Sequence, residues 1–363
     1  EANIKLGLHR INITTRTGGA WNNGYPDRSR FVVIDEDYNH TLTRFSARKL
    51  TVNASRKLGI TDSLLVVTND VVLNGDIRLI NSSGATGNSE SQFIQTHTSA
   101  SLVSGGGRLL VDQNSTVPSK YRYNYVGSPV TSSAGASDYT VASILKDGTN
   151  PTTYTGTIGN LSSNIARDIT FLAGSTLDGD ATTTPISLAD RWMYTYAASG
   201  GTRASWDQKR STGPIPNTDG FIFKGPGVVQ NYTFMGVPKD GVLTTTIYDK
   251  QIERETLADE SYLVANPYAS SISVKEFIED NTNSITGTLY FWEHAGEDNT
   301  ETGHNFAGYI GGYATRTIAT GVTAKAASSG PIDTNLQAES ATITGGTTET
   351  VSGNDGNVDV VTL

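Results

Sequence analysis

Cysteine is absent from the chain, which excludes a disulfide framework, thiolate zinc sites and cysteine nucleophiles. No apolar run reaches the roughly 18 residues that a membrane-spanning helix needs. Charged residues make up only 17% of the sequence, and the net charge is −9. Binding to nucleic acid requires a basic surface. We therefore expect neither nucleic-acid binding nor a membrane-embedded chain.

The residues that are abundant favour strands and turns. Thr, Ser, Gly and Asn dominate, and 16 tyrosines make up most of the aromatic residues. These residues suit pleated sheets and tight turns better than helices. The length of 363 residues favours more than one domain. We predict an all-β protein. Because the sequence begins at Glu1 without methionine, we also expect a cleaved signal peptide.

We divide the chain into four regions. Residues 1–44 contain a strand with alternating apolar residues, followed by a Gly- and Asn-rich loop. The apolar residues of this strand are Ile4, Leu6, Leu8, Ile11 and Ile13. Residues 45–125 contain short apolar triplets that are separated by turns such as Asn74-Gly75. This spacing favours a β-solenoid of short rungs over a tight meander or an antiparallel sandwich.

Residues 126–320 contain longer strand-like segments separated by turns, which predicts a β-sandwich or jelly-roll-like domain. One short helix is expected near residues 274–280, with Ser273 and Glu276 as a capping box and Asn281 as a left-handed C-cap. Residues 321–363 form a tail rich in Thr, Ser and Gly. Its apolar pairs, such as Val358 with Val360, would suit a strand added to its own domain or to a neighbouring subunit.

No recognised catalytic motif occurs in the sequence, including the nucleophile elbow, the zinc-protease helix, the phosphate loop and the dinucleotide fingerprint. We therefore expect no enzymatic activity and no cofactor. His294 and His304 flank an acidic loop that is a candidate metal or acid–base site, although its spacing matches no established ligand motif. Asp355, Asn357 and Asp359 match the opening of a calcium loop, but the later ligands of that motif are missing.

Aromatic side chains offer a second kind of candidate site. Trp21 and Trp206 lie in polar segments, where an exposed ring can stack on a sugar. Trp192 and Trp292 alternate with Tyr194 and Tyr290, a pattern typical of strand residues in a core. A β-helical enzyme that cleaves glycans is a third reading, which would require convergent carboxylates that spacing alone does not reveal.

Four sequence stretches together resemble secreted surface proteins of Bacteroidota, particularly flavobacterial proteins exported by the type IX system. They are YRYNYVGSPV at 121–130, NPYASSISVKEFIEDN at 266–281, GTLYFWEH at 287–294 and GYIGGYATRT at 308–317. The resemblance implies an extracellular, cell-surface β-protein and carries no catalytic residues. The chain departs from this group at its end, where VDVVTL stands in place of a β-sandwich sorting domain.

The leading functional prediction is a structural subunit of an extracellular surface assembly, in which copies of the chain form a filament by β-strand addition. The inserted side chains would be Ile4, Leu6, Leu8, Ile11 and Ile13, or Val358 and Val360. An inserted strand pairs its backbone with the acceptor while alternate side chains fill pockets. The alternative is a monomeric adhesin that binds surface glycans.

Overall fold

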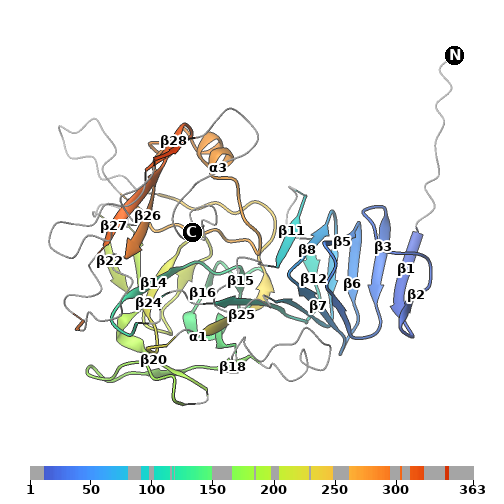
Figure 1. Ribbon diagram of the computed structural model, residues 1–363, viewed down its shortest axis with the longest axis horizontal. Helices are drawn as coiled ribbons and strands as arrows, with labels where there is room; N and C mark the ends of the chain where they lie inside the picture. Colours follow the sequence, from blue (N-terminus) through green and yellow to red (C-terminus); the bar gives the residue numbers. More distant parts are fainter. Residues whose placement is uncertain are drawn as a thin grey trace.

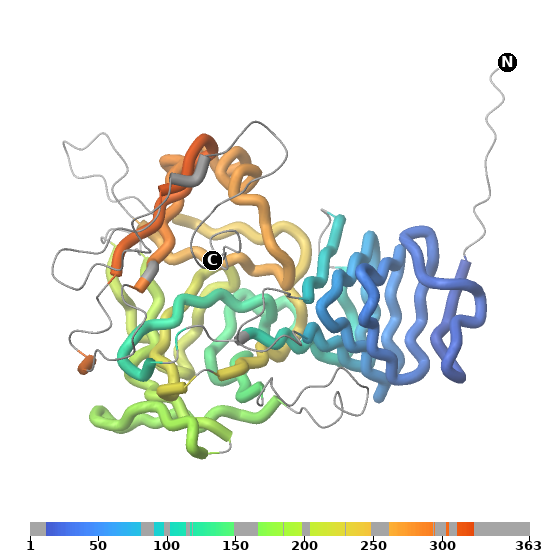
Figure 2. Tube along the Cα trace, in the orientation of Figure 1, coloured from blue at the N-terminus to red at the C-terminus, as the bar shows by residue number. Residues whose placement is uncertain are grey.

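The protein is nearly all β in its computed structural model, as the composition predicts (Figure 1, Figure 2). The structure describes residues 12–80, 91–97, 102–114, 117, 119–148, 166–183, 185–197, 204–228, 230–247, 261–294, 303–304, 311–322 and 340–342. Within these residues, no helix is long and apolar enough to cross a membrane.

The strands β1 to β13 build a β-solenoid, in which successive turns of the chain add parallel strands to three sheets (Figure 1). In spatial order, the first sheet contains β12 (Val103–Ser104), β9 (Val71–Leu73), β6 (Lys49–Val52), β3 (Arg30–Ile34), β1 (Asn12–Thr17) and the antiparallel β2 (Ala20–Trp21). The second sheet contains β13 (Leu109–Asn114), β10 (Asp76–Ile80), β7 (Lys57–Thr61) and β4 (Tyr38–His40). The third contains β11 (Gln92–Gln95), β8 (Leu64–Val67) and β5 (Arg44–Ala47).

Each apolar triplet in the sequence is one side of a solenoid turn. Leu50 is stacked between Val32 and Val71 in the first sheet, and all three side chains are fully buried. Parallel in-register stacking places like residues above one another, so a column of aliphatic side chains fills the interior. The solenoid reading of the triplets is confirmed, and the antiparallel sandwich is not found in this region.

Tight corners join the first sheet to the second, and two glycines are essential to their packing. A Cβ atom on Gly75 would lie 2.2 Å from the carbonyl oxygen of Arg56, and one on Gly107 would lie 1.9 Å from the carbonyl oxygen of Gly75. The corners of successive turns therefore stack backbone on backbone. The Asn74-Gly75 turn is one of these corners.

The parallel pairing begins before residue 45, where the triplets start. β1 pairs with β3, and β3 pairs with β6. The loop that follows β2 folds over the end of the solenoid, so the first turn lacks the compact spacing of the later ones. Ile13 lies in β1 and is about half exposed.

The second solenoid sheet continues into the rest of the protein. β25 (Asn231–Pro238) pairs antiparallel with β13 over its whole length and also contacts β17 (Leu145–Asp147). Strands β18 (Arg167–Asp168) and β15 (Val130–Thr131) complete this eight-stranded sheet. Buried apolar residues of both parts form one continuous core. β25 is therefore the strand that joins the solenoid to the antiparallel part.

The remaining sheets are mostly antiparallel. One contains β14 (Tyr123–Val126), β24 (Phe221–Lys224), β21 (Tyr194–Ala197) and β22 (Ser205–Gln208). A second contains β26 (Leu289–His294), β27 (Gly311–Arg316), β28 (Thr320–Val322) and β29 (Ser340–Thr342). Two short pairs are β16 (Asp138–Tyr139) with β23 (Ile215–Pro216), and β19 (Thr170–Leu172) parallel to β20 (Ser187–Ala189). β29 thus adds part of the tail to a sheet of its own chain.

The predicted short helix is confirmed as α3 (Val274–Asp280), whose N-terminus is capped by the Ser273 hydroxyl accepting from the Glu276 amide. The prediction for its other end is wrong. Asn281 has a φ of −111° and instead donates from its side chain to the Phe277 carbonyl. The structure also has α1 (Val141–Ile144), capped by Thr140, and a 3-10 turn, η3 (Asp190–Trp192).

Candidate ligand-binding site

Most residues proposed from the sequence for strand exchange or calcium binding lie outside the described residues. These are Ile4, Leu6, Leu8, Ile11, Val358 and Val360 for strand exchange, and Asp355, Asn357 and Asp359 for calcium. Among the described residues, no group of three His, Asp or Glu side chains is arranged to hold a metal ion.

Trp21 covers the end of the solenoid. The expectation that it forms an exposed platform for a sugar is therefore wrong. Its ring packs against Tyr25, Tyr38 and Phe45, with centroids 6.1, 5.6 and 5.9 Å away. Phe45 is fully buried in the third sheet, so this aromatic cluster closes the first turn of the solenoid. A short strand at the end of a solenoid needs such a cover because the apolar interior would otherwise meet water. The loop composition alone did not reveal this role.

Trp206, in contrast, is exposed as expected and belongs to a larger aromatic surface. It lies on the edge strand β22 with 44% of its surface accessible. Tyr196 on β21 and Tyr125 on β14 contact it edge-on, with ring centroids 5.0 and 6.4 Å away. The residues Ser205 to Gln208 of β22 are all exposed, so one face of Trp206 is open to a ligand.

The aromatic surface continues onto the neighbouring hairpin of β26 and β27, which lies beside β22 in Figure 1. Tyr313 contacts Trp292 and Tyr290, with centroids 5.0 and 6.2 Å away. Burial raises the pKa of the Tyr313 phenol, and the nearby phenol of Tyr196 raises it further, which links the two sheets. Tyr290 and Tyr313 are each more than half exposed. We call these six rings, Tyr125, Tyr196, Trp206, Tyr290, Trp292 and Tyr313, the aromatic surface.

A cavity of about 180 Å³ adjoins two rings of the aromatic surface. Tyr125 and Trp292 line it together with polar and apolar residues, most of them from β13, β14, β17, β24, β25 and β26. Its other lining residues are Gln113, Val117, Tyr123, Asn124, Val126, Leu145, Phe223, Tyr232, Phe234 and His294. Concave sites that combine aromatic walls with a few amide and imidazole groups suit small polar ligands.

His294 fixes the hairpin over this cavity. Its Nε2 lies 2.9 Å from the carbonyl oxygen of Tyr123 on β14, and the Trp292 indole N–H donates to its Nδ1 over 3.4 Å. The Tyr123 contact requires the proton on Nε2, and the Trp292 contact requires Nδ1 to accept, so both are met by one neutral tautomer. His294 therefore orients Trp292 and connects the two antiparallel sheets.

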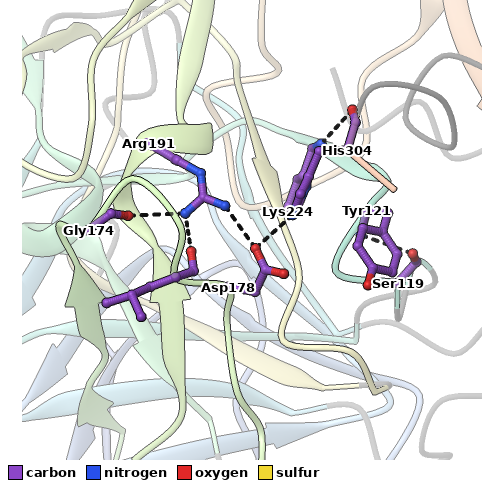
Figure 3. Close-up of polar contacts among 8 residues, drawn as sticks. Ser119, Tyr121, Gly174, Asp178, Arg191, Lys224 and His304 are labelled. Carbon is purple, nitrogen blue, oxygen red and sulfur yellow. Dashed lines mark hydrogen bonds and ion pairs between the residues drawn. The ribbon is translucent and has the colours of Figure 1, made fainter. Parts of the chain in front are cut away.

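A second polar cluster surrounds His304, the other histidine singled out in the sequence (Figure 3). His304 Nε2 lies 2.8 Å from Asp178 Oδ1, and its Nδ1 lies 3.2 Å from Lys224 Nζ. Its ring stacks on Trp192 with centroids 4.9 Å apart. Arg191 also donates to Asp178 over 2.9 Å and binds the carbonyl groups of Gly174 and Leu177.

The environment of Lys224 is enclosed. Its Nζ lies 3.8 Å from the Trp192 ring centroid and 4.7 Å from that of Tyr123, and the residue is only 2% exposed. Burial lowers the pKa of the Lys224 amine to about 8, although Asp178 opposes this shift. Burial, followed by the charge of Lys224, also lowers the pKa of His304. These contacts hold the chain at His304 against β24 and η3.

Sequence reasoning found part of both sites. It selected Trp206 from its polar surroundings, and it selected His294 and His304, although as ligands of one acidic loop. The structure instead gives these histidines separate partners, Tyr123 and Asp178. Sequence reasoning did not find Lys224, because a lysine within the strand FIFK carries no signal that its amine is buried. Nor did it connect Tyr196 with Tyr313, which lie on different sheets.

No curated protein and no solved structure matches the chain significantly. A family model described as a domain of unknown function (DUF8693) matches residues 174–357, slightly more than half of the chain. The match covers β21, β22, β26 and β27, which carry most of the aromatic surface, and it follows the solenoid in sequence. The chain therefore belongs to the DUF8693 family.

Proposed function

We propose that this protein is a non-catalytic adhesin module on the outside of a bacterial cell, and that its aromatic surface binds glycans. In this proposal the β-solenoid is a rigid stalk, and the antiparallel part carries the binding site. The observation that supports it most is the aromatic surface itself, which consists of two groups of three contacting rings on neighbouring sheets, with three of the six rings substantially exposed.

Stacked rings suit carbohydrate because a sugar has an apolar face of C–H groups and a rim of hydroxyls. Tyrosine and tryptophan offer a flat apolar ring with one polar atom, and little side-chain entropy is lost when they bind. The cavity beside Tyr125 and Trp292 adds Gln113, Asn124 and His294 as polar lining residues. The net charge of −9 favours neutral or basic glycans over polyanionic ones.

A glycan array tests this proposal, followed by retention on the polysaccharide that gives the best signal. We expect the wild-type chain to bind and Trp206→Ala or Tyr313→Ala to bind about 30-fold more weakly, since removal of a central ring typically costs about 2 kcal/mol. Tyr25→Ala is the matched control, because Tyr25 is an exposed ring at the solenoid end. A chain that binds no glycan, or binds equally well without Trp206, would refute the proposal.

The second candidate is a filament subunit polymerised by β-strand addition. The observation that favours it is the strand β22, which has β21 as its one partner among the described residues and is exposed along its length. An unpaired edge is a template for a strand from another copy. Because such head-to-tail addition does not close, it would produce fibres.

Size-exclusion chromatography with negative-stain electron microscopy separates the two candidates. If the segment around Leu6 is the donor, Leu6→Asp should abolish fibres while the subunit stays folded. Lys5→Asp is the control, because it adds a carboxylate at the neighbouring position, whose side chain points to the opposite face of a strand. A wild-type chain that remains monomeric at high concentration, or fibres that persist in Leu6→Asp, would count against this donor strand.

A further inference from the structure

Three residues with chemically complementary side chains lie close to one another where β25 leaves the eight-stranded sheet. Lys239 directly follows β25, and its amide donates to the carbonyl of Pro129. Asn217 and Asp219 lie in the turn after β23. β15, β16 and β25 lie close together in this part of the molecule (Figure 1).

Lys239 is a buried amine with little to stabilise its charge. The residue is 4% exposed, and its Nζ donates to the backbone carbonyl of Asn217 over 2.6 Å and lies 4.6 Å from the Tyr139 ring centroid. Within the described part of the chain, no carboxylate forms an ion pair with it. Burial lowers the pKa of the Lys239 amine to about 7, so a large share of molecules carry the neutral, nucleophilic amine near pH 7.

Asp219 is the matching buried acid. It is 9% exposed, and in the described part of the chain its carboxylate receives one hydrogen bond, a long one of 3.4 Å from the Thr218 hydroxyl. Burial raises the pKa of this carboxyl group. The Tyr139 hydroxyl donates to the backbone carbonyl of Asp219 over 2.8 Å and fixes the turn beside Lys239. A carboxyl group with a raised pKa can deliver a proton as a general acid.

Asn217 is two residues before Asp219, and its backbone carbonyl accepts from the Lys239 amine. Its Nδ2 donates to the Ala136 carbonyl over 2.5 Å, whereas its Oδ1 is buried and has no hydrogen-bond partner among the described residues. A buried amide oxygen without a donor is costly. The Lys239 amine already contacts the backbone carbonyl of this residue, so the amine and the carboxamide that would react belong to two residues in direct contact.

From this geometry we propose that Lys239 and Asn217 form an intramolecular amide cross-link, with Asp219 as the proton-transfer group. The Lys239 Nζ lone pair attacks Cγ of Asn217, and the carboxyl proton of Asp219 passes to Nδ2. The Cγ–Nδ2 bond breaks and ammonia leaves. The nitrogen of Lys239 then returns a proton to Asp219, so the acid is regenerated. No oxidant, metal or cofactor is required.

The cross-link would tie the end of β25 to the turn after β23. β25 is the strand that joins the solenoid to the antiparallel part, so a covalent bond at its end would resist separation of these parts under force. The chain has no cysteine, and an amide bond would serve this purpose where a disulfide is not available. This inference does not depend on glycan binding.

Mass spectrometry of the full folded chain tests the cross-link. We expect the main species to be lighter than the sequence mass by one ammonia molecule, and proteolysis to yield a branched peptide that joins Lys239 to Asn217. We expect no loss of ammonia in three variants, so that each has the full mass of its sequence: Lys239→Met, Asn217→Ala and Asp219→Asn. Lys224→Met is the matched control, because it removes another buried lysine and should keep the loss of ammonia.

Three results would overturn the proposal. The first is a wild-type chain with the full sequence mass. The second is a loss of ammonia that maps to a linear peptide, as a succinimide would give. Hydroxylamine cleaves the chain at a succinimide but leaves an amide cross-link intact. The third is a loss of water that joins Lys239 to Asp219. The wild-type measurement decides the matter even if a variant fails to fold.

Discussion

Stacked corners of the solenoid make a sharp prediction about two adjacent glycines. Gly107→Ala would place a Cβ atom 1.9 Å from the carbonyl oxygen of Gly75 and 2.8 Å from that of Leu73. Gly106→Ala would place a Cβ atom with nothing within 4 Å. Neither residue has a positive φ in the structure, so the difference between the two variants is steric.

The magnitude follows from what must move. The obstructing atoms near Gly107 belong to the backbone of the preceding turn, which cannot rotate away as a flexible side chain can. Overpacking in a well-packed interior typically costs about 1–3 kcal/mol, and a backbone clash of this size belongs at the upper end. We expect Gly107→Ala to lose about 3 kcal/mol of unfolding free energy. Gly106→Ala should change it by about 0.5 kcal/mol or less.

Urea denaturation followed by circular dichroism measures the difference, with equal m-values as the requirement for comparison. Hydrogen exchange of β10 and β13, the strands that follow the two stacked corners at Gly75 and Gly107, should increase in Gly107→Ala only. Equal stabilities of the two alanine variants would refute the reasoning, because they would mean that successive corners do not stack as closely as the structure shows.

Two further predictions concern buried charges. Asp240→Ala should lower the free energy of unfolding, measured by urea denaturation, by about 3–5 kcal/mol. Asp240 is buried, and its carboxylate accepts from Gln95 Nε2 at 2.6 Å and the Leu102 amide at 2.5 Å, with His97 Nε2 at 2.8 Å. A loss below about 1 kcal/mol would contradict this reasoning. Lys224 binds a proton less readily when folded, with a pKa of about 8 against 10.5, so the unfolded state holds more protons between these values and stability should rise with pH there. Lys224→Met should flatten that rise and the exposed control Lys275→Met should not, whereas equal slopes would show that the Lys224 amine is not desolvated.

Short-range signals in the sequence predicted much of the fold. The apolar triplets indicated the solenoid because each turn of the chain needs only a short run of buried residues in each sheet, such as Leu50 and Val52 in β6. The Ser273 cap fixed the start of α3 in the same way. The four residues of α1 were missed, because Val141 and Ile144 are apolar and their spacing does not distinguish a single helical turn from a strand.

Long-range pairing explains what the sequence did not reveal. Trp21 and Trp206 both lie in polar segments, yet one is covered by Tyr38 and Phe45 and the other is open. Only the position of neighbouring turns decides between these outcomes. Likewise, His304 is separated in sequence from Asp178 and Lys224, so their contact depends on how three segments pack together.

Isothermal titration calorimetry with the glycan that binds best on the array tests the central claim most directly. The aromatic surface predicts saturable binding by the wild-type chain, a Kd about 30-fold higher for Trp206→Ala, and an unchanged Kd for Tyr25→Ala. If Trp206→Ala binds as tightly as the wild type, or if Tyr25→Ala weakens binding equally, the aromatic surface is not the glycan site.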